Sequence, residues 1–352
     1  MKKIIALILL CPLFCVAQND MQYTNLALEG GGVHGIAYAG AFKALEERGI
    51  LKNIQKIAGT SAGAIAGLAA CLNYTSAQMD SILMTLKFEK LNDGKGGLFG
   101  KYKRVKNKFG IYKGDKFEKW LKTLIEEKTG KSDLTFKQLH ELHITNPAYK
   151  DLYCTGTNVS RQRLEIFSYE TTPNFSIATA VRISGGIPLF FEPIALDDNL
   201  QPIKKGDTAS FINYYVDGGA LCNFPISMFD TCVGKGNPLL CNTLKFNNAT
   251  LGLKIERPAQ IDSFQNNNTS IPYFRPKNFK QYVMAFTNLT METLARRYPG
   301  LENELGRTVY ISFGSSNSMI KKMSVADKQL LFDNGEKAVI HFFETKNSTA
   351  NK

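Results

Sequence analysis

A serine near position 60 lies in a short glycine turn of the kind that presents a nucleophile. The segment Gly59-Thr60-Ser61-Ala62-Gly63 matches the pattern G-x-S-x-G and falls between an expected strand and an expected helix. Flanking glycines allow a sharp turn, which would lift the Ser61 hydroxyl to the helix start, where backbone N–H groups favour developing negative charge. The plain alternative is a packing turn of small residues. The position between strand and helix favours a nucleophile elbow around Ser61.

Three consecutive glycines, Gly30, Gly31 and Gly32, lie between an earlier strand and helix. With no side chains in the way, their N–H groups can point at one oxygen, as an oxyanion hole requires, and the N–H of Ala62 would join them. With Gly35 the segment also satisfies G-x-G-x-x-G, the fingerprint of dinucleotide-binding folds. That fingerprint needs an acidic residue at the end of the next strand, where this chain has the serine turn instead. We therefore expect an oxyanion loop and no nucleotide cofactor.

Asp217 ends a short expected strand and is followed by Gly218 and Gly219. An Asp-Gly-Gly sequence is most often a structural turn, but a serine nucleophile needs a base within hydrogen-bond reach. An aspartate is ordinarily a weak base at pH 7. It can serve here only if its carboxylate is partly desolvated and bonded directly to Ser61. Asp217 is therefore the candidate base, and the two glycines support its position.

Histidine is the alternative base, and the chain has four: His34, His140, His143 and His341. In an α/β-hydrolase triad the histidine follows the acid, so only His341 has the right order. It lies in a helical pattern, where a packed histidine is the plainer interpretation. His34 borders the glycine loop and could approach Ser61. This inventory favours a Ser61–Asp217 dyad over a triad.

The surrounding elements indicate an α/β fold. Two strand–turn–helix units follow each other over residues 25–49 and 54–72, which argues for a parallel sheet covered by helices. Further strands are expected at 152–159, 163–168, 214–216, 251–255 and 308–313. Further helices are expected at 76–88, 115–128, 175–184, 279–297 and 325–345, with Ser76 as an N-cap. The glycine-rich residues 92–100 are expected to form a loop.

Basic and aromatic residues alternate over Lys101–Lys116. Seven Lys or Arg residues stand against Asp115 alone and are interleaved with Tyr102, Phe109 and Tyr112. The plainest interpretation is an exposed, solvated loop, which could act as a lid if it covers the site. The functional alternative is peripheral contact with an anionic bilayer, where each basic residue contributes ~1 kcal/mol. Nucleic acid would use the same charges, but we expect no nucleic-acid partner.

The first residues are typical of an export signal. Residues 1–17 combine a lysine pair, a short apolar run and a final small residue, and the run is too short for a membrane span. We expect this segment to be removed and the protein to reach the periplasm, the outer membrane or the medium. A buried helix and a lipoprotein signal are the alternatives.

Composition excludes disordered and fibrous classes, because 44% of the residues are hydrophobic and 21% are charged. The net charge of +12 suits nucleic acid, anionic lipid or an acidic substrate equally and names no partner. Without the export signal five cysteines remain, none in a C-x-x-C pair, so a zinc ribbon is not expected and no metal or cofactor is predicted. An exported protein can form disulfides, and spacing favours one bridge among Cys222, Cys232 and Cys241.

Together and in this order, the motifs resemble the patatin-like phospholipase family. The G-G-G-x-x-G segment, the G-T-S-A-G turn and the D-G-G turn occur in that family's order, and Ala180–Pro188 (AVRISGGIP) is similar to its segment between nucleophile and aspartate. The resemblance covers Leu26 to Pro225. One departure is His34, because many relatives carry Arg or Lys there. Histidine is mostly neutral near pH 7, so an anion-steering role for the loop is in doubt.

The resemblance implies a three-layer α/β/α sandwich with a mainly parallel sheet and a catalytic domain over residues 24–230. It implies acyl-ester hydrolysis of phospholipids or related lipids without a metal. Ser61 would be the nucleophile and Asp217 the base. Residues 231–352 are expected to form an α/β extension packed on the catalytic domain. Two alternatives stay open: a Ser-His-Asp esterase of non-lipid esters, and a non-catalytic lipid-binding module on the same scaffold.

Overall fold

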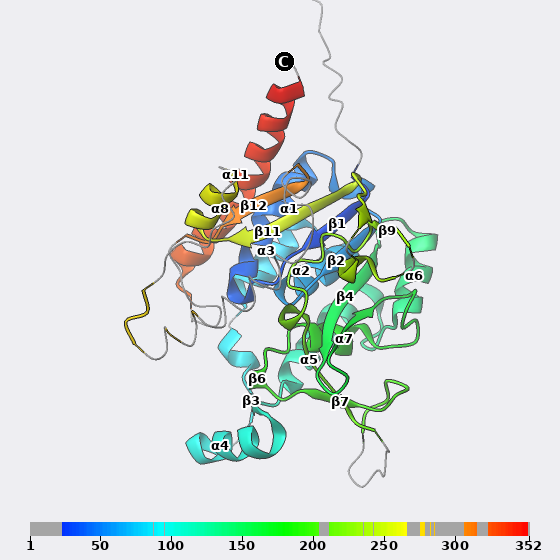
Figure 1. Ribbon diagram of the computed structural model, residues 1–352, viewed down its shortest axis with the longest axis vertical. Helices are drawn as coiled ribbons and strands as arrows, with labels where there is room; N and C mark the ends of the chain where they lie inside the picture. Colours follow the sequence, from blue (N-terminus) through cyan, green and yellow to red (C-terminus); the bar gives the residue numbers. More distant parts are fainter. Residues whose placement is uncertain are drawn as a thin grey trace, which may run out of the picture.

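A computed structural model describes residues 23–86, 88–94, 96–203, 211–234, 236–241, 243–265, 275–278, 282, 285, 306–314 and 323–350. Eight strands form the central sheet (Figure 1). Successive hydrogen-bonded neighbours are β12 (Thr308–Ser312), β11 (Thr250–Glu256), β1 (Asn25–Leu28), β2 (Lys56–Gly59), β4 (Asp151–Asn158), β8 (Asn213–Asp217) and β7 (Ile194–Leu196), and β5 (Arg163–Phe167) also pairs with β4. The five strands from β12 to β4 are parallel, and β5, β7 and β8 pair in antiparallel fashion. The predicted α/β fold with a mainly parallel sheet is confirmed.

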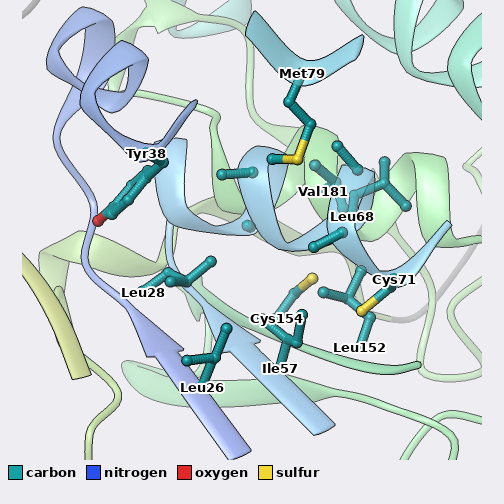
Figure 2. Packing of buried hydrophobic residues seen from close by; sticks show 14 of the residues in the cluster. Leu26, Leu28, Tyr38, Ile57, Leu68, Cys71, Met79, Leu152, Cys154 and Val181 are labelled. Carbon is teal, nitrogen blue, oxygen red and sulfur yellow. The ribbon is translucent and has the colours of Figure 1, made fainter. Parts of the chain in front are cut away.

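Helices cover one face of this sheet. They are α1 (Ala37–Glu47), α2 (Ala62–Cys71), α3 (Ser76–Thr85), α5 (Asp115–Thr129), α6 (Phe136–Thr145), α7 (Ile177–Ser184) and α11 (Val325–Ala350). Figure 2 shows Leu68 of α2, Met79 of α3 and Val181 of α7 packed above Leu26 and Ile57 of the sheet. Burial of these apolar side chains stabilises the packing of the helical layer on the strands.

The opposite face is covered by the chain that follows β8. Because side chains alternate along a strand, Leu26 and Leu28 face the helices, while Ala27 packs against Phe224 and Ile226. This second layer contains short elements: the single turns η4 (Gly218–Ala220) and η5 (Pro238–Leu240), and the hairpin β9 (Thr231–Cys232)–β10 (Leu244–Lys245). The central strands are thus buried on both faces, as parallel strands require.

The C-terminal part of the chain contributes to the same sheet. Strand β11 pairs with β1 on one side and with β12 on the other, and the short helix α8 (Pro258–Gln265) lies beside β12. Helix α11 packs along α1 at two glycines. A Cβ atom on Gly335 would lie 1.9 Å from the carbonyl oxygen of Ala37, and one on Gly40 would lie 1.9 Å from that of Phe332. The two backbones are therefore in direct contact.

A smaller unit extends from the sheet. Helix α4 (Gly97–Lys108) lies at one end of the molecule in Figure 1, below the sheet, and is followed by β3 (Gly110–Tyr112), which pairs with β6 (Leu189–Phe191). The predictions of a loop over 92–100 and an exposed loop over 101–116 are wrong in part. The glycines Gly96 and Gly97 adopt positive φ and only start the helix, and the residues after Gly100 are good helix formers.

Element boundaries differ from prediction where capping decides them. Thr75, not Ser76, caps α3: its hydroxyl accepts the Gln78 N–H at 3.2 Å, and the Gln78 side chain accepts the Thr75 N–H at 3.1 Å. The single turns η2 (Leu51–Asn53) and η3 (Phe88–Leu91) were not predicted. The predicted export signal (1–17) lies outside the described residues, as does the predicted helix 279–297 except for residues 282 and 285.

The expected disulfide pairs Cys232 with Cys241 and closes the β9–β10 hairpin. Cys222 is buried against the sheet and takes no part in this bridge. Within the described ranges, no helix is sufficiently long and apolar to span a bilayer.

Candidate active site

The turn between β2 and α2 holds Ser61 in a backbone conformation that few residues other than glycine adopt. Its φ is 53° and its ψ is −119°. Such a conformation costs of order 1–3 kcal/mol, so the surrounding packing must impose it. A Cβ atom on Gly59 would lie 2.4 Å from the carbonyl oxygen of Gly63, and one on Gly63 would lie 2.3 Å from that of Leu28. Both flanking positions therefore require glycine, and Ser61 stands at the N-terminus of α2.

The sheet topology brings Asp217 to this serine. On one edge of β4, the parallel strand β2 ends with Gly59 opposite Cys154, and the antiparallel strand β8 ends on the same edge with Asp217 opposite Gly156. Strand β5 takes the other edge of β4. The carboxyl ends of β2 and β8 therefore meet head-on. This places Ser61 beside the Asp217 carboxylate, close enough to lower the pKa of that group.

The Asp217 carboxylate is buried and held by further hydrogen bonds. Its Oδ1 accepts the Gly219 N–H at 2.8 Å, and its own N–H donates to the Gly186 carbonyl at 3.0 Å. Burial raises the pKa of Asp217 to about 6, while the hydrogen bonds from Gly219 and Ser61 lower it in part. The carboxylate is thus ionised at neutral pH and more basic than an exposed aspartate.

The glycine loop runs beside Ser61. A Cβ atom on Gly30 would lie 3.1 Å from the Ser61 Cβ, and one on Gly35 would lie 2.7 Å from the Ala62 Cβ. Gly32 has a φ of 55° and opens the single turn η1 (Gly32–Ile36), whose first N–H groups have no acceptor within the turn. The N–H of Ala62 is in the same position at the start of α2. Two sets of backbone donors thus flank Ser61.

Gly30 itself uses its N–H elsewhere. That group donates to the Asn223 carbonyl oxygen at 2.9 Å, so it is not directed at an oxyanion in this structure. The donors that stay available from the predicted set are those of Gly31, Gly32 and Ala62. Gly30 instead provides the close approach of the loop to Ser61.

The histidines are placed away from the role of base. The ring of His34 is buried and stacks on that of Phe313, with centroids 4.4 Å apart, and burial lowers the pKa of His34 to about 4. His341 is exposed on α11. The other two histidines lie on α6 and are hydrogen-bonded to residues after that helix. His140 Nδ1 lies 3.0 Å from Asp151 Oδ1, and His143 Nδ1 lies 2.7 Å from the Tyr149 carbonyl oxygen. Asp217 is the candidate base that lies beside Ser61.

Three hydroxyl-bearing residues that the sequence analysis missed hold the turn in place. The Thr60 and Thr155 hydroxyl oxygens lie 2.6 Å apart, and Thr60 also donates to the Cys222 carbonyl at 3.0 Å. Ser184, at the end of α7, accepts the Ser61 N–H at 3.0 Å. The one signal in the sequence was Thr155, a polar residue at a position of β4 that the strand pattern expects to be buried. Nothing else in the sequence indicates a role for these three residues.

Helix α7 also joins the site to the α4 unit through Arg182, which is 1% exposed. Its guanidinium donates to the carbonyl oxygens of Gly114 at 3.2 Å, Lys113 at 2.9 Å and Glu192 at 3.0 Å. It also lies over the Phe191 ring, 4.7 Å from the centroid. Arg182 therefore holds the segments that connect α4 to the rest of the protein. It precedes Ser184, which contacts the nucleophile, by two residues on the same helix.

Helix α4 presents an exposed surface that is both apolar and basic. Leu98 is 87% exposed and Phe99 is 79% exposed, values unusual for large apolar side chains. Phe109, next to the helix, and Leu189 of β6 extend the apolar area. The exposed basic residues are Lys103, Lys106, Lys108, Lys113 and Lys116. We call these nine residues together with Tyr102 the α4 surface.

A family model described as patatin-like phospholipase matches residues 26–230. This match runs from β1 to beyond the end of β8 and includes the glycine loop, the Ser61 turn and Asp217.

Three curated relatives are similar over shorter or longer stretches. "Uncharacterized protein R571" of Acanthamoeba polyphaga mimivirus is 28% identical over 323 residues, 91% of this chain and 94% of that protein. "Uncharacterized protein YqhO" of Bacillus subtilis (strain 168) is 36% identical over 213 residues, 59% of this chain and 67% of that protein. "Probable lipid hydrolase 463L" of Invertebrate iridescent virus 6 is 27% identical over 213 residues, 58% of this chain and 63% of that protein. The first match necessarily continues past residue 230.

Among solved structures, VipD from Legionella pneumophila is similar with a TM-score of 0.58 and 18% identity. The match covers 92% of this chain and 67% of that one. At this identity the likeness shows a shared fold.

Proposed function

The chain belongs to the patatin-like phospholipase family, and on that premise we propose that it is a serine lipid acyl hydrolase of the phospholipase A type, cleaving acyl esters of phospholipids or related lipids. The observation that carries the proposal is that the ends of β2 and β8 bring Ser61 beside the buried Asp217 carboxylate, next to two sets of backbone donors. A relative named as a probable lipid hydrolase supports a lipid as the substrate.

In the first half of the reaction, Ser61 Oγ attacks the ester carbonyl carbon and passes its proton to Asp217. The carbonyl electron pair moves onto the oxygen, where N–H groups of Gly31, Gly32 and Ala62 stabilise the negative charge. Loss of one such donor would raise the barrier by about 3 kcal/mol. The C–O bond to the alcohol then breaks, and the departing alkoxide takes the proton from Asp217.

In the second half, water attacks the acyl-serine carbon and gives its proton to Asp217. The same N–H groups stabilise the second oxyanion. Its collapse releases the fatty acid, and Ser61 Oγ takes back the proton. A base whose pKa is about 6 suits both halves, because it is ionised at pH 7 and still basic enough to accept a proton in the transition state.

We extend the proposal to the membrane: the α4 surface is the part of the protein that contacts an anionic bilayer. Apolar side chains that are mostly exposed, such as Leu98 and Phe99, suit insertion among acyl chains, and the surrounding lysines suit anionic head groups. Not every basic residue serves this contact. Arg104 donates to the Ile111 carbonyl at 2.8 Å, and Lys101 lies over the Tyr112 ring, so both hold α4 against β3.

The proposed location is outside the cytoplasm, after removal of residues 1–17. Support comes from the Cys232–Cys241 disulfide, since such bonds persist mainly in oxidising compartments. N-terminal sequencing of the protein recovered from its cells and medium tests this. A start at residue 18 in the exported fraction is expected, and an intact Met1 on a cytoplasmic protein would contradict it.

A fluorophosphonate probe and a mixed phospholipid panel together test the hydrolase. We expect the probe to label Ser61 and the purified chain to release fatty acids, detected by mass spectrometry. Ser61→Ala should abolish both signals, whereas Ser81→Ala, which removes an exposed hydroxyl on α3, should leave them unchanged.

The same assay separates the alternatives. A triad esterase predicts that His341→Ala or His34→Ala abolishes hydrolysis while Asp217→Asn does not. A lipid-binding module predicts lipid binding by the folded protein with no labelling and no fatty acid release. Either result would overturn the dyad mechanism.

A further inference from the structure

The glycine loop is held from outside by a short chain of polar contacts that the proposed mechanism does not use. Gly30 and Asn223 exchange two hydrogen bonds: the Gly30 N–H donates to the Asn223 carbonyl at 2.9 Å, and the Asn223 amide donates to the Gly30 carbonyl at 3.1 Å. A Cβ atom on Gly30 would lie 2.3 Å from the Asn223 side-chain oxygen. The first residue of the loop is therefore clamped between Asn223 and Ser61.

The side chain of Glu29 continues this chain of contacts. Its Oε1 accepts the Asn223 amide at 3.3 Å, and its Oε2 accepts the backbone N–H of Ile255 at 2.9 Å. Glu29 is 4% exposed, so these contacts lie in the interior, where hydrogen bonds are strong and their loss is costly. The carboxyl group thus connects the loop after Asp217 to strand β11.

Strand β11 also supports the loop by packing. A Cβ atom on Gly31 would lie 3.2 Å from Ile255 Cδ1, so Ile255 contacts the donor region directly. Further along, the buried ring of His34 stacks on Phe313, which follows β12. Both Ile255 and Phe313 lie beyond residue 230, where the family match ends.

We propose that Asn223 and Glu29 are positioning residues, which hold the N–H groups of Gly31 and Gly32 in line with Ser61, and that β11 is thereby part of the active site. This inference rests on the proposed hydrolase function. Neither side chain touches the substrate. They set the direction of the donors, and a displacement of about 1 Å at such a group can cost on the order of 100-fold in rate.

The ionisation of Glu29 agrees with this role. Burial raises the pKa of Glu29 to about 8, with a further rise from Glu256, while Lys254 and the hydrogen bonds from Ile255 and Asn223 lower it. Both carboxyl oxygens accept N–H groups, which favours the charged form and opposes the effect of burial, so a donor in place of either oxygen would disturb the contact.

Asn223→Ala tests the inference, with Asn247→Ala as its matched control. Asn247 also uses its side-chain amide for two hydrogen bonds, to the Phe229 carbonyl at 3.3 Å and from the Ala249 N–H at 3.0 Å, but it lies in the turn before β11. Turnover of a phospholipid is measured per active site, counted by labelling with fluorophosphonate to completion. We expect Asn223→Ala to lower kcat 10- to 100-fold with KM within twofold, and Asn247→Ala to leave kcat within twofold.

A role limited to stability would give a different result. It would reduce the number of labelled sites and the midpoint of thermal unfolding while kcat per site stays unchanged, and that outcome overturns the inference. If Asn223→Ala does not fold, Glu29→Gln is tested instead. The glutamine side chain keeps one acceptor oxygen, but its NH2 group replaces the other oxygen and faces an N–H donor of Asn223 or Ile255. A kcat within twofold of wild type would then contradict the proposal. Failure of the hydrolase function itself is distinct: the wild-type chain would show neither turnover nor labelling.

Discussion

The Asp217 carboxylate must be buried to gain basicity and ionised to accept a proton, and these two conditions oppose each other. Burial raises its pKa to about 6 from the ordinary 3.8, while bonds from Gly219 and Ser61 preserve the charged form. Activity that depends on the ionised base should fall tenfold for each pH unit below 6. A rate that stays constant between pH 6 and pH 4, measured on vesicles that stay intact in this range, would contradict the assignment.

The same pKa predicts that Asp217→Asn stabilises the protein while it removes activity. The folded state binds this proton more tightly than the unfolded state, so the stability that protonation contributes is complete below pH 3.8 and is lost as the pH rises through 6. Above pH 6 the ionised group costs up to about 3 kcal/mol relative to a neutral one. Asparagine keeps the shape and an acceptor oxygen. Urea unfolding at pH 8 should therefore show a higher free energy of unfolding for the variant, and at pH 3.5 the difference should be small.

At this scale the sequence identified the residues of the site and not their supports. Ser61, Asp217 and the glycines stand in local patterns whose chemistry can be recognised without a structure. Thr155 and Asn223 carry no such pattern, and Ser184 lies in the recognised segment Ala180–Pro188 without a sign of its contact to Ser61. Their roles depend on the register of β4 and on the path of the chain after Asp217, which bring together residues far apart in sequence.

Helix α4 has exposed apolar side chains in its first turn and exposed lysines after it. Replacement of Lys103, Lys106 and Lys108 by Gln removes three exposed charges. At ~1 kcal/mol for each charge near an anionic bilayer, binding to vesicles that contain phosphatidylglycerol should weaken on the order of 100-fold at low salt. Sedimentation with these vesicles measures this, and phosphatidylcholine vesicles should bind weakly throughout.

The apolar part of the α4 surface predicts a second effect. Leu98→Ser with Phe99→Ser should weaken binding in a manner that salt does not restore, because insertion of apolar side chains is not screened. Leu330→Ser with Lys337→Gln on α11 is the matched control, since both are exposed there. Equal loss in the control pair, or none in the α4 pair, would exclude α4 as the contact.

The attachment of α4 depends on one buried cation. Arg182→Met keeps an unbranched apolar stem but removes the guanidinium donor from three carbonyl groups, of which that of Gly114 is buried and those of Lys113 and Glu192 are partly buried. A buried acceptor without a partner costs about 1–3 kcal/mol, so we expect the free energy of unfolding to fall by several kcal/mol and protease cleavage to increase within residues 96–116. Lys337→Met, at an exposed site, should change neither quantity.

The prediction of elements succeeded where hydrophobic periodicity is strong and failed where glycines obscure it. The strand–turn–helix units, the β4–β5 hairpin and the strands β8, β11 and β12 agree with expectation within a few residues. Helix α4 was missed because Gly96, Gly97 and Gly100 suggest a loop. The apolar side chains of this helix face solvent and not a core, so its sequence lacks the periodic pattern of a helix packed on a sheet.

For the whole molecule, the contact between α1 and α11 determines how tightly the C-terminal part is joined to the rest. Gly335→Ala would place a methyl group 1.9 Å from the Ala37 carbonyl oxygen. Although alanine favours a helix over glycine, the overlap should cost about 3 kcal/mol or more and dominate. Gly306→Ala is the control, because no atom lies within 4 Å of that Cβ position. Equal urea midpoints for the two variants would contradict the close packing.

The position of β11 beside β1 has a consequence for the order of events during synthesis. Asn25 of β1 pairs with Thr250 of β11, so the partner of β1 on this edge is synthesised more than 200 residues after β1 itself. The nucleophile, its glycines and the aspartate are all translated while the open edge of β1 has no partner. On the proposed role of β11, the donors beside Ser61 gain the support of Ile255 and Phe313 only after nearly the entire polypeptide has been made, and we expect the nascent chain to be inactive until then.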